Sequence, residues 1–155
     1  MKLKEKAKGY RVAIGVCYGY QPIIQREVGP RSAILPGMHS DAVLEHFRNP
    51  HNGGELADAT ATADVTNPVC GDILRLAVRV ENGRIAAVRF KAQGCVASMA
   101  ASSMLTDLLA GKTPAQARSI TAQEISDALG GLPPTTFHAA QLAGDALAAV
   151  LAKLR

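Results

Sequence analysis

Residues 68–98 read PVCGDILRLAVRVENGRIAAVRFKAQGCVAS, and apolar residues alternate with charged or small ones in two successive runs. The first run is residues 73–80 and the second is residues 84–91. A period of two is typical of a strand that buries one face. The turn-forming pair Asn82-Gly83 separates the runs. We therefore predict an antiparallel hairpin.

The register of this hairpin follows from the length of its turn. A two-residue loop would place the apolar residues of one strand opposite the charged residues of the other. A three-residue loop, residues 81–83 with Gly83 in the left-handed conformation, pairs residue 80 with residue 84 and keeps all the apolar side chains on one face. Since a slip of one residue would turn every side chain over, we predict the three-residue loop.

Two thiols and a carboxylate are expected at the open end of the hairpin. In the predicted register Asp72 lies opposite Ala92 and Cys70 opposite Gly94, with Cys95 next along the chain. Cys95 is expected to begin a helix, where free N–H groups and the helix dipole favour a thiolate.

Helical spacing and capping residues predict the elements outside the hairpin. Ser40 is a favourable N-cap for a short helix that stops at Asn49-Pro50, and residues 60–66 are Ala/Thr/Val-rich, as an edge strand would be. Further helices are predicted after Cys95, after residues 113 and 121, and after Pro134. Strands followed by helices indicate an α+β fold, a small antiparallel sheet of about three strands with helices packed on one face.

Composition limits the class of protein. The chain has 155 residues, 48% of them hydrophobic and 19% charged, as expected of one soluble domain. Residues 1–37 carry seven Lys/Arg against two Asp/Glu, while residues 38–155 are nearly neutral. We expect a disordered basic extension over residues 1–37 and a domain over 38–155 that binds neither nucleic acid nor membrane. Three cysteines and no secretory signal point to a reducing cytoplasm.

Four residues at three element ends suggest a metal site. Cys70 and Asp72 lie two apart on an extended segment, Cys95 opens a helix, and His138 falls in the first turn of the last helix. Two sulfurs, one carboxylate and one imidazole suit a tetrahedral site for zinc or iron. Each residue alone is more often a packing or capping residue, so spacing leaves both readings open. The other histidines, His39, His46 and His51, are interpreted as surface or capping residues.

These motifs together resemble the IscU and NifU N-terminal family of iron–sulfur cluster assembly scaffolds. The resemblance spans residues 40–153 and is carried by the segments DAVLEHFRNPHNG (41–53), NPVCGD (67–72), FKAQGC (90–95), GKT (111–113) and LPP (132–134), with His138. It implies an α+β scaffold, not an enzyme, that builds a [2Fe–2S] cluster. Sulfur would come from a cysteine desulfurase, and the cluster would pass to recipient apo-proteins.

The resemblance also implies roles for single residues. Cys70 and Cys95 would be cluster ligands, Asp72 the carboxylate that keeps the cluster labile, and His138 an auxiliary ligand. The family's third cysteine follows the histidine, and here this position is Ala139; the usual lysine two residues before the histidine is Thr136. We therefore expect a weakened scaffold, in which these four groups supply two ligands per iron to a cluster or bind iron. Mixed ligation of this kind is known in Rieske centres.

Two alternatives remain open at this point. One is a zinc-binding regulatory or structural protein on the same fold that no longer builds clusters. The other is a metal-free interaction module. In any of these roles, the scaffold included, the chain would act as a monomer or a homodimer. No Ser/His/Asp arrangement, P-loop or dinucleotide motif suggests classical catalysis.

Overall fold

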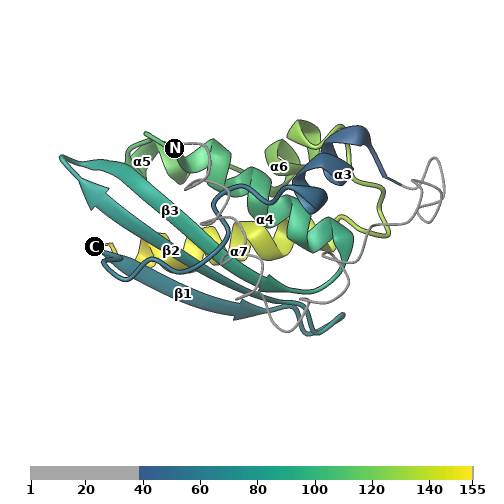
Figure 1. Ribbon diagram of the computed structural model, residues 1–155, viewed down its shortest axis with the longest axis horizontal. Helices are drawn as coiled ribbons and strands as arrows, with labels where there is room; N and C mark the ends of the chain where they lie inside the picture. Colours follow the sequence, from purple (N-terminus) through teal and green to yellow (C-terminus); the bar gives the residue numbers. More distant parts are fainter. Residues whose placement is uncertain (1–38, 155) are drawn as a thin grey trace, which may run out of the picture.

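The computed structural model describes residues 39–154, which form a three-stranded sheet and five helices (Figure 1). The strands are β1 (Ala61–Thr66), β2 (Ile73–Glu81) and β3 (Arg84–Gln93). The helices are α3 (Asp41–Arg48), α4 (Val96–Leu109), α5 (Pro114–Ala117), α6 (Ala122–Ala128) and α7 (His138–Ala152). The basic extension predicted for residues 1–37 lies outside the described residues, as does Cys17.

The sheet is antiparallel throughout, in the order β1-β2-β3. Its buried face carries Leu74, Leu76 and Val78 from β2, and α4 and α7 pack against this face (Figure 1). Many of the buried residues of both helices are alanines. The predicted α+β architecture, with helices on one face of a small sheet, is confirmed.

The predicted hairpin register is wrong. Glu81 pairs with Arg84, so the loop has two residues, Asn82 and Gly83, both with positive φ (50° and 74°) as a type I′ turn requires. One step further the register shifts: Val80 pairs with Ile85, but Arg79 pairs with Ala87. The extra residue in β3 is a β-bulge, and it returns the apolar residues of both strands to the same face despite the short loop.

The free edge of β3 is covered by the loop that follows α3. Gly54 N–H donates to Phe90 O at 2.8 Å, and Phe90 N–H donates to Asn52 O at 3.1 Å. This covering leaves less unpaired backbone for association with another chain. It also fixes residues 51–54 beside α4, which matters for the histidine cluster described below.

Side-chain caps explain where the helices begin. Ser40 Oγ accepts from Val43 N–H at the start of α3, and Thr121 with Glu124 forms a capping box for α6, both as predicted. In the part of the chain that the structure describes, no helix has the length and apolar character needed to cross a membrane.

Candidate metal centre

The candidate site lies at one end of the sheet, where β1 ends, β2 begins, β3 ends and α4 begins (Figure 1). A tight turn over residues 67–72 presents Cys70 there. Asn67 organises the turn: its carbonyl accepts from Gly71 N–H at 2.8 Å, and its side-chain Oδ1 accepts from Val69 N–H at 2.9 Å. Gly71 has a φ of +74°, the left-handed conformation that favours glycine.

Three of the four predicted ligands converge. One ligand atom each from Cys70, Asp72 and His138 lies within 4.8 Å of the other two. Their exposure differs: Cys70 is exposed, His138 is half-buried at the first position of α7, and Asp72 is 7% exposed. Sulfur, oxygen and nitrogen donors thus face one small volume whose outer side is open to solvent.

Cys95 borders this group from the start of α4. It is the N-cap residue, and its Sγ accepts from Ser98 N–H at 3.4 Å. Its backbone N–H donates to Asp72 Oδ2 at 3.5 Å, which ties the helix start to the carboxylate. The Cys95 sulfur does not lie within 4.8 Å of all three other donors, so it flanks the cluster of ligand atoms.

Hydrogen bonds hold Asp72 in its ionised form. Burial alone would raise the pKa of this carboxyl, but hydrogen bonds from Ser98 and from both cysteines lower it further than burial raises it. The pKa of Asp72 therefore lies below its usual value. Ser98 Oγ donates directly to Asp72 Oδ2. A buried, ionised carboxylate beside two thiols is suited to neutralise a bound cation.

The pKa of the Cys70 thiol is raised above its usual value. Desolvation is the largest cause, and the negative charge of Asp72 raises the pKa further. This thiol therefore keeps its proton more strongly than a free cysteine would. A metal ion must displace that proton to bind, so binding at this site releases protons and weakens as the pH falls.

Sequence reasoning missed two residues of this site, Ser98 and Gly94. Ser98 is buried and contacts both Cys95 and Asp72; its position three residues after an N-cap was the available signal. A Cβ on Gly94 would lie 2.5 Å from Asp72 Cγ, so only glycine leaves room for the carboxylate. Ala139, where a third cysteine was expected from the resemblance, is 1% exposed.

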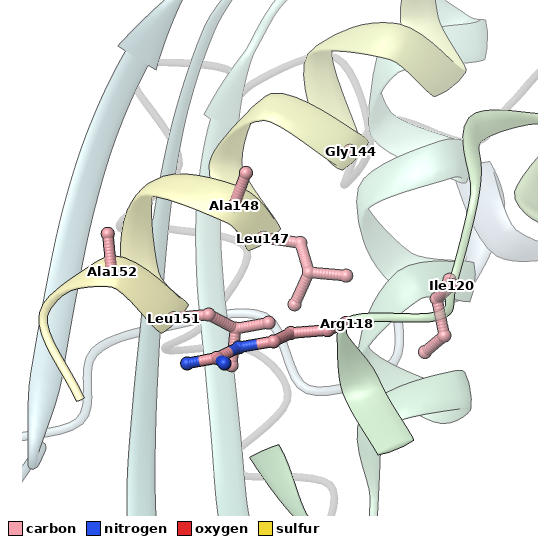
Figure 2. A pocket seen from close by; sticks show the side chains of 7 residues that line it. All are labelled: Arg118, Ile120, Gly144, Leu147, Ala148, Leu151 and Ala152. Atoms are coloured by element: carbon pink, nitrogen blue, oxygen red, sulfur yellow. The ribbon is translucent and has the colours of Figure 1, made fainter. Parts of the chain in front are cut away.

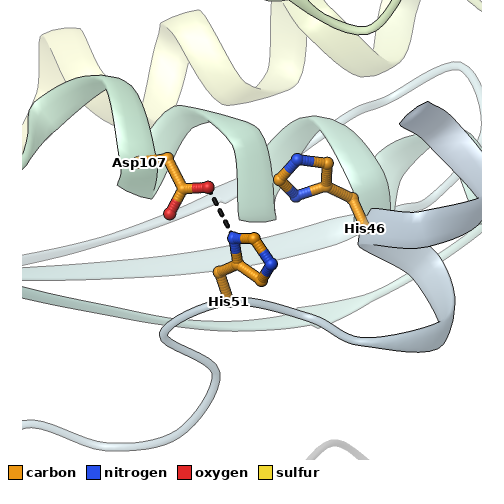
Figure 3. Close-up of side chains that lie close together, drawn as sticks. All are labelled: His46, His51 and Asp107. Atoms are coloured by element: carbon orange, nitrogen blue, oxygen red, sulfur yellow. Dashed lines mark hydrogen bonds and ion pairs between the residues drawn. The ribbon is translucent and has the colours of Figure 1, made fainter.

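The interpretation of His46 as a surface or capping residue is wrong. His46 is not a surface residue: it is 7% exposed and its Nδ1 lies 2.8 Å from Ser103 Oγ. His51 is half-buried and pairs with Asp107 (Figure 3). These contacts join α3 and the loop after it to α4, which lies far along the sequence from both. Local sequence patterns therefore gave no sign of them.

A hollow of about 240 Å³ lies between α7 and the segment joining α5 to α6 (Figure 2). Its lining is mostly aliphatic, with Arg118 as the charged side chain. It brings together no thiol, histidine or carboxylate. We therefore assign it no chemical role.

The chain is similar to known proteins in both sequence and fold. The family described as NifU-like N terminal domain matches residues 38–155. The iron–sulfur cluster assembly scaffold protein IscU 1 of Archaeoglobus fulgidus is 44% identical over 110 residues, covering 71% of this chain and 72% of the relative. IscU of Azotobacter vinelandii is 39% identical over 118 residues, covering 73% and 91%. In fold, the chain resembles the crystal structure of FiSufU from Fervidobacterium islandicum (TM-score 0.61, 19% identity, 74% and 96% covered).

Proposed function

Because the chain belongs to the NifU-like N-terminal domain family, we propose that it is a scaffold on which an iron–sulfur cluster is assembled before transfer to recipient proteins. The cluster is cargo in this function, and the chain is not an enzyme. The observation that carries the proposal is the convergence of Cys70, Asp72 and His138, with Cys95 beside them. Four such donors match the ligand number of a [2Fe–2S] cluster with two ligands per iron.

The exposure of the donors supports transfer of the cargo. Both thiols are exposed, so a recipient's thiolates can approach the cluster side that Cys70 and Cys95 hold. Asp72 is buried beneath them and is a harder, oxygen-donor ligand that binds iron in a cluster less firmly than a thiolate. A site built from two thiols, one carboxylate and one imidazole would hold a cluster long enough to assemble it and would still release it.

The alanine at position 139 implies a weakened site. With Ala139 directly after His138, the family's third thiol is missing, and the imidazole must serve as a ligand rather than as an auxiliary group. Protons compete with metal for the imidazole, so such a cluster would be held less firmly as the pH falls. We propose that a cysteine desulfurase supplies the sulfur in a reducing compartment, with Cys70 and Cys95 as the accepting thiols.

Anaerobic reconstitution with iron(II), cysteine, a cysteine desulfurase and a thiol reductant, which supplies the electrons that turn persulfide sulfur into sulfide, tests the proposal. We expect a [2Fe–2S] chromophore that is absent from the Cys70→Ser and Cys95→Ser variants. Cys17→Ser is the matched control, because Cys17 lies outside the family match, and it should leave the chromophore unchanged.

A colourless wild-type product would overturn the proposal. So would zinc that binds through Cys70 and Cys95 in stoichiometric amount and is not replaced during reconstitution. The second outcome would instead identify a zinc protein on the scaffold fold.

A further inference from the structure

A second group of metal-ligand side chains lies away from the cysteines, and the proposed scaffold function does not use it. His46 belongs to α3, His51 to the loop after it, and Asp107 to the last turns of α4 (Figure 3). One ligand atom from each lies within 4.8 Å of the other two. Cys95 and Asp107 stand at opposite ends of α4, twelve residues apart, so about 18 Å of helix separates the two groups.

The buried member, His46, is held in place by α4. Its Nδ1 lies 2.8 Å from Ser103 Oγ, and its ring centroid lies 4.6 Å from that of His51 with the planes tilted by 52°. The same hydroxyl accepts from the backbone N–H of His51 at 2.8 Å. One serine therefore fixes the ring of His46 and the backbone of His51 together.

The other two members are also positioned by neighbours. His51 Nδ1 lies 2.5 Å from Asp107 Oδ2, and Asn52 Nδ2 donates to Asp107 Oδ1 at 3.4 Å and to Thr106 Oγ1 at 3.0 Å. The hydrogen bonds of this loop to β3, described above, add to the restraint. Supporting contacts of this kind orient the ligands in protein metal sites.

Charge and access suit a cation. The side chains of His51 and Asp107 are 40% and 38% exposed, so an ion can enter from solvent, while His46 closes the inner side. Among the described residues, Asp107 contacts His51 and Asn52 and makes no ion pair with a lysine or arginine. No lysine or arginine therefore competes with an incoming cation for this carboxylate.

We propose that His46, His51 and Asp107 bind one divalent transition-metal ion of the zinc or iron(II) class. Two imidazoles and one carboxylate are a common ligand set for both ions, and they leave a coordination position for water. Ligand atoms about 2.0–2.1 Å from a tetrahedral ion lie about 3.3 Å apart. His51 Nδ1 and Asp107 Oδ2 would therefore separate by about 0.8 Å, which exposed side chains can do.

Zinc titration of the full chain carrying Cys70→Ser and Cys95→Ser tests this site apart from the thiols. Calorimetry should show one zinc per chain. Adding His51→Gln or Asp107→Asn should weaken binding at least ~10-fold. Both positions are exposed enough that the fold should persist, and circular dichroism checks this.

The matched control is Asp127→Asn in the same double-serine background, and it should leave zinc binding unchanged. Asp127 is an exposed carboxylate bonded to Gln123 and lies outside both groups of ligand side chains. The proposal is overturned if the double-serine protein binds no zinc, or if His51→Gln and Asp107→Asn bind it as tightly as the control. Either result leaves the scaffold proposal untouched, because that proposal rests on the separate group of Cys70, Asp72, Cys95 and His138.

Discussion

Replacing Gly94 by alanine should displace the Asp72 carboxylate without changing any ligand residue. The added Cβ would lie 2.5 Å from Asp72 Cγ and 2.8 and 2.9 Å from its carboxylate oxygens, whereas ordinary Cβ contacts begin near 3.4 Å. The carboxylate must therefore move by about 0.9 Å, the difference between 3.4 and 2.5 Å. It cannot stay in place, because the backbone of Gly94 belongs to the fixed connection between β3 and α4.

The displacement has a cost in stability and a cost in metal binding. Disturbing the hydrogen bond from Ser98 to the charged Asp72 costs about 1.5–3 kcal/mol. Alanine offsets about 0.4–1 kcal/mol of this by restricting the unfolded chain. The net loss of about 1–2 kcal/mol should lower the melting temperature of the metal-free protein by about 4–8 °C. Since metal sites tolerate ligand displacements of only about 0.2 Å, a reconstituted cluster should be lost to a chelator at least ~10-fold faster.

Thermal unfolding and cluster loss to a chelator, both on the full chain, measure these effects. Gly144→Ala is the matched control: a Cβ there meets nothing within 4 Å, and the position lies inside α7, so alanine should stabilise the protein slightly. The reasoning is refuted if Gly94→Ala holds its cluster as long as the wild type does. It is also refuted if Gly94→Ala and Gly144→Ala shift the melting temperature alike.

Three further substitutions probe the site and the hairpin. Ser98→Ala should lower the free energy of unfolding at pH 7 by about 1–3 kcal/mol. Because the pKa of Asp72 is lowered in the folded state, this contribution is present above its unfolded pKa and lost as the pH falls, so the deficit should shrink below about pH 4. Urea unfolding at both pH values checks this, and a pH-independent deficit would contradict it. Ala139→Cys should lengthen the lifetime of the reconstituted cluster, since it adds a thiol beside the site; an unchanged absorbance decay would count against the third-thiol argument. Gly83→Ala should cost about 1–2 kcal/mol in urea unfolding, because its φ is +74° and its surroundings are open; no loss would contradict the left-handed turn.

The hairpin shows what alternation in a sequence can and cannot predict. Leu74, Leu76 and Val78 of β2 are buried, as the alternation predicts, because a strand with one buried face must alternate. Ala77, predicted on the other face, is buried too, and Val80 is only half-buried. The predicted register was wrong because two rules conflicted. Asn82-Gly83 favours a two-residue loop, whereas the apolar alternation of the two strands favours a loop with an odd number of residues. The fold satisfies both with a bulge at Ala86, an extra residue that no local pattern announces.

The site was predictable where its residues lie at element ends. Cys70, Asp72 and His138 each stand next to a glycine, proline or helix start, and these signals place them at one end of the fold. Ser98 was not predicted because its role depends on where its hydroxyl points. The cluster of His46, His51 and Asp107 depends on the packing of α3 against α4, which only the three-dimensional structure reveals.

Iron and acid-labile sulfide in protein isolated anaerobically from cells test the central claim most directly. If Cys70, Asp72, Cys95 and His138 hold an iron–sulfur cluster, the two should be present in equal amounts and should disappear together in the Cys70→Ser variant. Protein that contains no sulfide, whatever its content of zinc or iron, would contradict the account.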